Sequence, residues 1–277
     1  MRVVDTVAVM KKVRRDASGT VGFVPTMGYL HEGHLSLARR ARPENDLVVA
    51  SIFVNPTQFG PNEDFSRYPR DPERDLAMLS SEAVDLVFMP SVEELYPDGF
   101  NTSVEVGGIT GRLEGAIRPG HFKGVATIVN KLFNIVQPTR AYFGQKDAQQ
   151  AIVIGKMVTD LDLNVEVVVM PTVREQDGLA MSSRNVYLNG EERRAALVLH
   201  RSLKLASEMR QAGEQSAGKL RLAMTALIES EPLARIDYVS VADVRTLEEL
   251  DTIAGPTLLS LAVRIGKTRL IDNTILE

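Results

Sequence analysis

The chain has 277 residues, of which 44% are hydrophobic and 25% charged, and its formal net charge is −4. This size and composition are those of a globular protein with one large domain or two unequal domains. The negative net charge argues against a general nucleic-acid binder, and the absence of cysteine excludes disulfides, thiolate catalysis and cysteine metal sites.

The N-terminal segment, residues 1–16, does not have the order of a secretory signal. Its short apolar patches come first and its basic residues follow, whereas a signal peptide carries its charge before the apolar core. No apolar stretch approaches the length needed to span a bilayer. With the lack of cysteine, which fits a reducing compartment, these features predict a soluble cytoplasmic protein with neither membrane nor nucleic-acid partners.

Continuous apolar runs before residue 175 predict strands that are buried on both faces, at residues 20–26, 47–54, 84–90, 140–144 and 165–173. Helical patterns lie between these runs, at residues 35–41, 71–83, 122–136 and 148–160. The second of them opens with Asp71 as a cap and Pro72 at the first helical position. Alternating strands and helices predict a parallel sheet covered on both sides. The fold class is therefore a doubly wound, Rossmann-like α/β domain, which binds ligands at the carboxyl edge of its strands.

The pattern changes after about residue 175. Residues 190–214 and 216–230 predict surface helices, and residues 235–243, 257–265 and 268–276 predict short strands. The last two strands are joined by a hairpin turn at Gly266-Lys267. We therefore predict a catalytic domain over residues 1–175 and a smaller α+β domain over residues 176–277.

The segment PTMGYLHEGH, residues 25–34, contains two of the four histidines in the chain. One interpretation is a metal site, but the zinc-protease pattern needs histidines four residues apart on a helix, whereas His31 and His34 are three apart with Gly33 between them. A second interpretation is a loop histidine followed by a helix-cap histidine with no chemical task.

The third interpretation of this segment is an anion site. A strand ends at Thr26, a glycine-bearing loop turns, and a helix starts near Gly33. The backbone N–H groups and the positive dipole end of such a helix favour a bound anion. Gly28 and Gly33 would let a nucleotide approach the backbone closely, and imidazole N–H groups can donate to phosphate oxygens as charge develops in a transition state.

Four further segments between residues 20 and 190 also resemble motifs of one known family, in the same order along the chain. They are SIFVNPTQF (51–59), RPGHFKGV (118–125), FGQKDAQQ (143–150) and MSSRN (181–185). Together with residues 25–34 they resemble the motifs of the pantoate–β-alanine ligase (pantothenate synthetase) family. Its His-x-Gly-His signature is shared with the nucleotidyltransferase superfamily related to class I aminoacyl-tRNA synthetases. One departure from those synthetases is that Ala180 and Ser183 occupy the lysine places of their Lys-Met-Ser-Lys-Ser loop, and Arg184 follows.

The resemblance implies the ATP-dependent condensation of (R)-pantoate with β-alanine, through a pantoyl adenylate, to give pantothenate, AMP and pyrophosphate. ATP would then be a substrate, with Mg²⁺ held through its phosphates by protein ligands that the sequence does not identify. The resemblance also implies a homodimer. Two alternatives remain open: a nucleotidyltransferase of the same superfamily that keeps AMP on its product, and a nucleotide-sensing module without turnover.

The resemblance implies catalytic roles for His31, His34, Lys146 and Arg184. The histidines would contact the phosphates, Lys146 would hold pantoate or α-phosphate oxygens as a point charge, and Arg184 would clamp the β and γ phosphates with Ser182 and Ser183. The implied ATP-binding set is Thr26, Met27, Gly28, Tyr29, Leu30, His31, Glu32, Gly33, His34, Gly144, Gln145, Lys146, Asp147, Val173, Met181, Ser182, Ser183 and Arg184.

Gln58 and Gln150 would bind the substrates pantoate and β-alanine. Several of these residues have plainer interpretations: Asp147 could be only the N-cap of helix 148–160 rather than a contact to ATP or Mg²⁺, and Met27, Val173 and Met181 could be core residues. We further expect Arg118, with Glu114, to order the loop before helix 122–136.

Loop 178–185 begins with glycine and carries Ser182, Ser183 and Arg184. These side chains reach ATP only if the loop covers the nucleotide. We therefore expect the C-terminal domain to act as a lid that closes on ATP and excludes water from the adenylate.

Overall fold

The computed structural model describes residues 1–61 and 63–277 and divides them into two compact units. The first unit contains Met1–Gly111, Gly115–Gln145 and Gln149–Pro171. The second contains Arg112–Glu114, Lys146–Ala148 and Thr172–Glu277. The main division thus falls between Pro171 and Thr172, and two short segments from earlier in the chain belong to the second unit.

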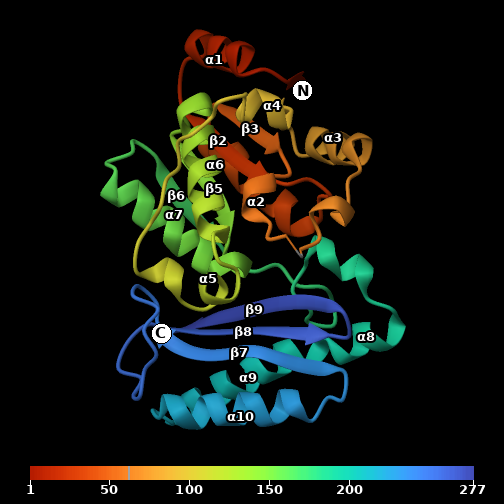
Figure 1. Cartoon of the computed structure of the whole chain (residues 1–277), viewed down its shortest axis with the longest axis vertical. Coiled ribbons are helices and arrows are strands. Elements are labelled where there is room, and N and C mark those ends of the chain that lie inside the picture. The colour runs from red at the N-terminus through yellow and green to blue at the C-terminus, as the bar shows by residue number, and fades with distance from the viewer. Residues whose placement is uncertain (62) are drawn as a thin grey trace. The chain divides into compact units, whose positions relative to one another are not determined.

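The first unit is built on a parallel sheet whose six strands have the order β1-β4-β3-β2-β5-β6, of which β3, β2, β5 and β6 are labelled in Figure 1. The strands are β1 (Arg2–Val4), β2 (Val21–Thr26), β3 (Leu47–Ile52), β4 (Leu86–Phe88), β5 (Arg140–Gly144) and β6 (Glu166–Met170). From β2 the chain proceeds to β3 and β4 on one side, whereas β5 and β6 lie on the other side. The doubly wound α/β prediction is confirmed, and β2 and β5 flank the point where the strand order reverses, the usual ligand site of such sheets.

Helices cover both faces of this sheet, because successive strand residues point to opposite sides. The helices are α1 (Val7–Asp16), α2 (Glu32–Glu44), α3 (Pro72–Ser81), α4 (Val92–Leu95), α5 (Glu114–Ile117), α6 (His121–Val136) and α7 (Ala148–Asp160). Residues of α1, α6 and α7 pack against Phe23 and Phe143 in one apolar cluster. Residues of α2 and α3 pack against Val24 and Tyr142 in another. Neighbouring strand residues therefore belong to opposite cores.

Local signals place α3 where the sequence predicts it. Pro72 is its first residue, and the Asp71 side chain accepts a hydrogen bond from the Arg74 N–H at 3.2 Å. The prediction that all strands are buried on both faces is wrong for β6, whose residues are half-buried or exposed. The reason is its position, since β6 is an edge strand that pairs only with β5.

The second unit contains the antiparallel sheet of β7 (Ala234–Asp243), β8 (Thr257–Ile265) and β9 (Thr268–Leu276), with helices α8 (Gly190–Ala195), α9 (Leu197–Gln211) and α10 (Ala217–Glu229) (Figure 1). Leu203 of α9 and Leu220 of α10 share an apolar core with Leu261 of β8. Ile265 pairs with Thr268, and Gly266 has a φ of 56°, so the predicted hairpin is confirmed. The predicted helix 190–214 is interrupted at Ala196, whose N–H still donates to the Glu192 carbonyl at 2.9 Å.

Candidate active site

The PTMGYLHEGH segment forms a tight turn between β2 and α2. β2 ends at Thr26, and the chain then takes left-handed backbone conformations at Gly28 (φ 80°) and Tyr29 (φ 50°). A Cβ at Gly28 would lie 3.0 Å from Asp75 Oδ2 and from the Ile52 side chain, so space as well as backbone conformation favours glycine there. α2 begins at Glu32, which places Gly33 inside the first helical turn rather than before it.

The two histidines of this segment cap the helix that they begin. His31 is the N-cap, and its Nδ1 accepts a hydrogen bond from the Gly33 N–H at 3.2 Å. His34 Nδ1 accepts one from the His31 N–H at 3.3 Å, and the ring centroids are 4.1 Å apart. Because both Nδ1 atoms are acceptors, the proton of each neutral ring lies on Nε2. In this tautomer the N–H donor of each ring is at Nε2, whereas the Nδ1 lone pairs accept backbone hydrogen bonds.

A second segment, the short 3₁₀ helix η1 (Pro56–Gln58), is fixed by Asn55. The Asn55 side chain, which is 1% exposed, donates to Gln58 Oε1 at 3.1 Å and to the Gly124 carbonyl at 3.2 Å. Gln58 Nε2 in turn lies 3.0 Å from Met27 Sδ, so the structure brings this predicted pantoate ligand against the signature loop. Asn55 stood within the quoted motif, but no feature of that motif indicated that its side chain would fix Gln58.

Helix α6 approaches η1 so closely that only glycine fits at the contact. A Cβ at Gly124 would lie 2.4 Å from the Thr57 carbonyl oxygen and 2.7 Å from the Gln58 backbone nitrogen. These are backbone atoms, which cannot move aside as the end of a flexible side chain can. Gly124, the second glycine of RPGHFKGV, therefore sets the distance between α6 and the segment that carries Gln58.

Arg118 forms an ion pair with Glu63 within the first unit. Its Nε donates to Glu63 Oε1 at 2.7 Å and its Nη2 to Oε2 at 2.6 Å. Burial is the largest single effect on the pKa of Glu63 and raises it. The hydrogen bonds and charge of Arg118, with smaller contributions from His121 and the Gly60 backbone, together outweigh burial, so the pKa lies below its ordinary value. Glu114 receives two 2.7 Å hydrogen bonds from Arg269, and both of these residues belong to the second unit. The expected role of Arg118, with Glu114, in ordering the loop before α6 stays a prediction.

Lys146 also belongs to the second unit. It lies in the 3₁₀ helix η4 (Gln145–Asp147), its side chain is 20% exposed, and its Nζ is 3.5 Å from Asp147 Oδ1. The Lys146 carbonyl accepts a hydrogen bond from Asn273 Nδ2 at 2.9 Å. Asp147 ends η4 directly before α7. Asn273 was not identified from the sequence, because nothing in a strand pattern indicates which distant carbonyl an amide will reach.

The loop before Ser182 is closed on itself and tied to β9. Arg174 donates to both carboxylate oxygens of Asp272, at 2.7 and 2.9 Å, and the Asp272 side chain is 1% exposed. Arg174 also forms a β-bridge with Ala180. Ser182 follows as the N-cap of the 3₁₀ helix η5 (Ser183–Tyr187), its Oγ accepting from the Arg184 N–H at 3.2 Å. Ser182 and Arg184 of the predicted phosphate clamp thus lie in one hydrogen-bonded turn.

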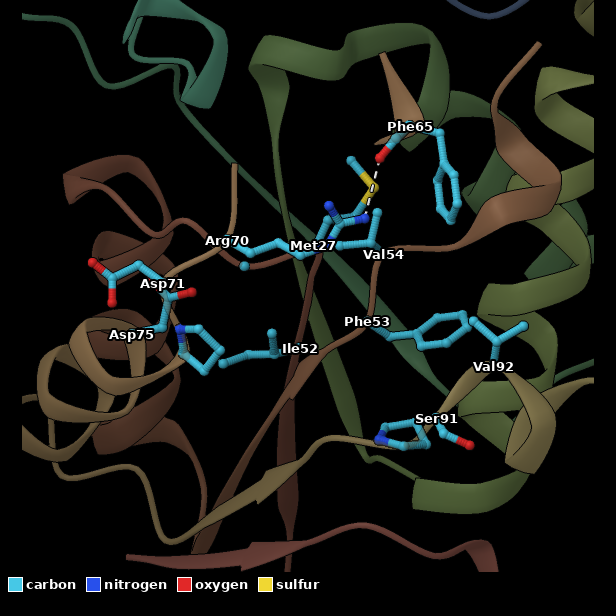
Figure 2. Close-up of a pocket in the computed structure, with 13 residues that line it drawn as sticks. Met27, Ile52, Phe53, Val54, Phe65, Arg70, Asp71, Asp75, Ser91 and Val92 are labelled. Atoms are coloured by element: carbon cyan, nitrogen blue, oxygen red, sulfur yellow. Dashed lines mark hydrogen bonds between the residues drawn. The ribbon is translucent and has the colours of Figure 1, made fainter. Parts of the chain in front are cut away.

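The first unit also contains a pocket of about 250 Å³ at the carboxyl ends of β2, β3 and β4 (Figure 2). Its lining is mostly apolar and consists of Met27, Gly28, Ile52, Phe53, Val54, Phe65, Arg70, Asp71, Pro72, Asp75, Pro90, Ser91 and Val92. Arg70 Nη2 donates a hydrogen bond to the Phe65 carbonyl at 3.1 Å, drawn as a dashed line in Figure 2. Met27 and Gly28 come from the predicted site, and Ile52, Phe53 and Val54 come from the SIFVNPTQF motif. No site role was predicted for the other lining residues.

The predicted site residues therefore fall into two groups, each described within its own unit. The first unit holds Thr26 to His34, Gln58, Gly144, Gln145 and Gln150, the last in the first turn of α7. A Cβ at Gly144 would meet no atom within 4 Å, so its backbone borders open space. The second unit holds Lys146, Asp147, Val173, Met181, Ser182, Ser183 and Arg184.

Over residues 1–61 and 63–277, no three histidine, aspartate or glutamate side chains are grouped so that they could hold a metal ion. Over the same ranges, no helix combines the length and apolar character of a membrane span.

The family model for pantoate-beta-alanine ligase matches residues 2–275. The pantothenate synthetase of Roseiflexus sp. (strain RS-1) is 65% identical over 277 residues, covering 100% of both chains. A pantothenate synthetase structure from Thermus thermophilus superposes with a TM-score of 0.95 at 52% identity, covering 99% of each chain. The Francisella tularensis pantoate-beta-alanine ligase, complexed with β-γ ATP and β-alanine, gives a TM-score of 0.82 at 36% identity, covering 99% of this chain and 97% of that one.

Proposed function

The chain belongs to the pantoate-β-alanine ligase family, and from this premise we propose which of its residues perform each step of the reaction. The enzyme is an ATP-dependent ligase that joins pantoate to β-alanine. The observation that carries the assignment of residues is the His31–His34 pair, which lies at the start of a helix at the carboxyl end of β2, with both Nδ1 atoms accepting backbone hydrogen bonds.

In the first step a carboxylate oxygen of pantoate attacks the α-phosphorus of ATP, and the bond from that phosphorus to the pyrophosphate oxygen breaks. The products are pantoyl adenylate and pyrophosphate. In the second step the amine of β-alanine attacks the acyl carbon, loses a proton, and displaces AMP. Neither step requires a protein nucleophile, so a chain without cysteine is suited to both.

His31 and His34 donate from Nε2 to phosphate oxygens as negative charge grows on the α-phosphoryl group, aided by the N-terminal dipole of α2. Lys146 supplies a point charge to the same oxygens or to the pantoate carboxylate. Ser182, Ser183 and Arg184 hold the β and γ phosphates. Met27, Gly144, Val173 and Met181 contact adenine and ribose through backbone and apolar surface.

Gln58 and Gln150 hold pantoate and β-alanine by neutral amides. An amide orients a carboxylate or hydroxyl by hydrogen bonds without neutralising the oxygen that must attack phosphorus. Support for Gln58 comes from its position, because Asn55 fixes its Oε1 and its Nε2 lies against Met27 of the signature loop.

We also propose Mg²⁺ as a companion of ATP, homodimeric assembly and a cytoplasmic location. Mg²⁺ would neutralise phosphate charge when bound, and Asp147 offers it a half-exposed carboxylate 3.5 Å from Lys146 Nζ. The dimer rests on family membership, and the location rests on the absence of cysteine from the sequence.

The adenylate route is tested with pantoate labelled with oxygen-18 in its carboxylate. Pantoate and ATP without an amine should yield pyrophosphate and an enzyme-held acyl adenylate, and addition of β-alanine should then release AMP that carries the label. Mass analysis of AMP and pyrophosphate is the measurement. AMP that never carries the label would contradict the adenylate mechanism. AMP that stays on the product after β-alanine is added would support the alternative nucleotidyltransferase.

The C-terminal domain is proposed to close on ATP as a lid. Arg184→Ala should raise the KM for ATP roughly tenfold or more, the scale of one lost hydrogen bond to a charged group, and change pantoate binding much less. Hydrogen exchange in residues 176–187 should slow when ATP and Mg²⁺ are added. Arg201→Ala, at an exposed position on α9, is the matched control and should leave both measurements unchanged. If hydrogen exchange in residues 176–187 is already slow without nucleotide and does not change when ATP is added, the loop does not close on ATP and the lid proposal is wrong.

A further inference from the structure

Asp75, in the first turn of α3, contacts the turn that leads to the two histidines. Its side chain is 1% exposed. Asp75 Oδ2 accepts a hydrogen bond from the Tyr29 N–H and Oδ1 one from the Leu30 N–H, each at 2.7 Å. The carboxylate therefore binds two successive backbone N–H groups, although it is more than forty positions away in the chain.

The neighbouring Arg74 holds the same two residues from outside. Its Nη2 donates to the Leu30 carbonyl at 2.9 Å, and its guanidinium carbon lies 5.3 Å from the centre of the Tyr29 ring. The N–H groups of Tyr29 and Leu30 and the Leu30 carbonyl are thus bound by two consecutive residues of α3. We call Arg74 and Asp75 together the α3 clamp.

The turn that the α3 clamp holds contains a strained backbone conformation at Tyr29. Tyr29 has a φ of 50°, a left-handed conformation that costs free energy for any residue other than glycine. The Asp75 carboxylate supplies two charge-assisted hydrogen bonds to this turn. His31 follows Tyr29 by two positions, so the conformation of this turn determines the backbone positions from which the His31 and His34 side chains extend.

Stability alone does not explain a carboxylate at this position. The helix cap is supplied by Asp71, and the exposed Glu73 already complements the dipole in the same turn. Burial raises the pKa of Asp75 above its ordinary value, and the hydrogen bonds from Leu30 and Tyr29 oppose this rise without cancelling it. Arg74 Nη1, its salt-bridge partner, is 3.9 Å from Asp75 Oδ1. Burying this charge therefore carries a net cost, which a role in the site would explain.

We propose that Asp75 is a positioning residue for adenylate formation, acting through the turn that carries His31 and His34. This inference rests on the proposed function of those histidines. Asp75 fixes the turn, the turn fixes the helix cap, and the cap fixes where the two Nε2–H groups meet the α-phosphoryl oxygens. Asp75 is assigned no contact with the reacting atoms.

The test compares Asp75→Asn with Glu73→Gln. Both changes remove one negative charge from the same turn of α3, but only Asp75 contacts the loop. Asparagine keeps the shape and one acceptor, and its NH₂ group must face one of the two backbone N–H groups. Asp75→Asn should lower kcat for adenylate formation about a hundredfold, the scale of a misplacement near one ångström, with a much smaller change in the KM for ATP. Glu73→Gln should match the wild type.

Nuclear magnetic resonance of the imidazole Cε1–H groups gives a readout that does not depend on activity. The chain has four histidines, so the spectrum is simple. In Asp75→Asn the His31 and His34 signals should move, whereas those of His121 and His200 should stay. In a double-mutant cycle, Asp75→Asn should add little to the loss already caused by His34→Ala, because both act on one group.

These measurements distinguish a failure of the positioning role of Asp75 from a failure of the proposed function of His34. Unmoved His31 and His34 signals, or a folded Asp75→Asn enzyme with wild-type kcat, would overturn the positioning role. Moved signals combined with a silent His34→Ala would instead overturn the proposed function of His34. Where Asp75→Asn does not fold, Arg74→Gln carries the same test, because it removes the solvent-exposed half of the α3 clamp. It should move the same two signals and lower kcat to a smaller extent.

Discussion

Replacing His34 by alanine is expected to slow adenylate formation about a hundredfold or more, the scale of losing one preorganised donor to developing charge. The His34 ring is fixed at Nδ1 by the His31 N–H and stacked beside the His31 ring, so its Nε2–H is held in place before ATP arrives. The fold should survive, because the lost cap hydrogen bond is worth only about 1 kcal/mol. Rapid-quench measurement of pyrophosphate in a single turnover reports the chemical step directly.

Two further substitutions separate the capping role of His34 from its donor role. His34→Asn keeps a polar atom near the position of Nδ1 and should be as slow as His34→Ala. His34→Gln places an amide nitrogen near the position of Nε2 and should recover part of the rate. Wild-type rates in all three variants would leave His34 as a helix cap only, and loss of the whole fold in His34→Ala would make the residue structural.

The largest effect on stability is expected from Asp272→Ala. It should lower the free energy of unfolding by about 3–5 kcal/mol, because it leaves the Arg174 guanidinium without the buried carboxylate that binds it bidentately. Urea unfolding, followed by circular dichroism, measures the change. Arg174 also bridges to Ala180, so the loop that carries Ser182 should become more susceptible to proteolysis in the variant.

The matched variant for this prediction replaces both partners, Arg174→Met with Asp272→Leu. Removing a buried ion pair as a whole costs less than breaking it, so the double variant should be more stable than Asp272→Ala. A single variant that unfolds at the same urea concentration as the wild type would show that the pair contributes nothing to the fold.

The regular elements could be predicted because local apolar patterns report burial. The runs at 20–26 and 140–144 became the adjacent strands β2 and β5, and the cap at Asp71 and the hairpin at Gly266 formed as predicted. β1 and α1 were not identified, since Arg2–Val4 is a three-residue strand with only one buried side chain. The edge position of β6 depends on strand order, which a local pattern does not contain.

Candidate site residues could be proposed from the sequence only where they lie in contiguous motifs, as the two histidines and Gln58 do. The partners that hold such residues in place come from distant segments: Asp75 binds the Tyr29 turn, Glu63 binds Arg118, and Asn273 binds the Lys146 carbonyl. The choice among many charged and amide side chains is made by three-dimensional packing, and no spacing in the sequence records it.

The membership of Lys146–Ala148 and Arg112–Glu114 in the second unit has a consequence for how the two halves of this enzyme could have evolved. Residues 172–277 do not contain the whole second unit. The buried Glu114 pairs with Arg269, and the Lys146 carbonyl accepts a hydrogen bond from Asn273, yet Glu114 and Lys146 both precede residue 172 in the chain. A recombination event that exchanged residues 172–277 between distant relatives would separate both pairs at once. Because segments 112–114 and 146–148 belong to the second unit, we expect the chain to have been inherited as one piece, with matched changes on either side of residue 172.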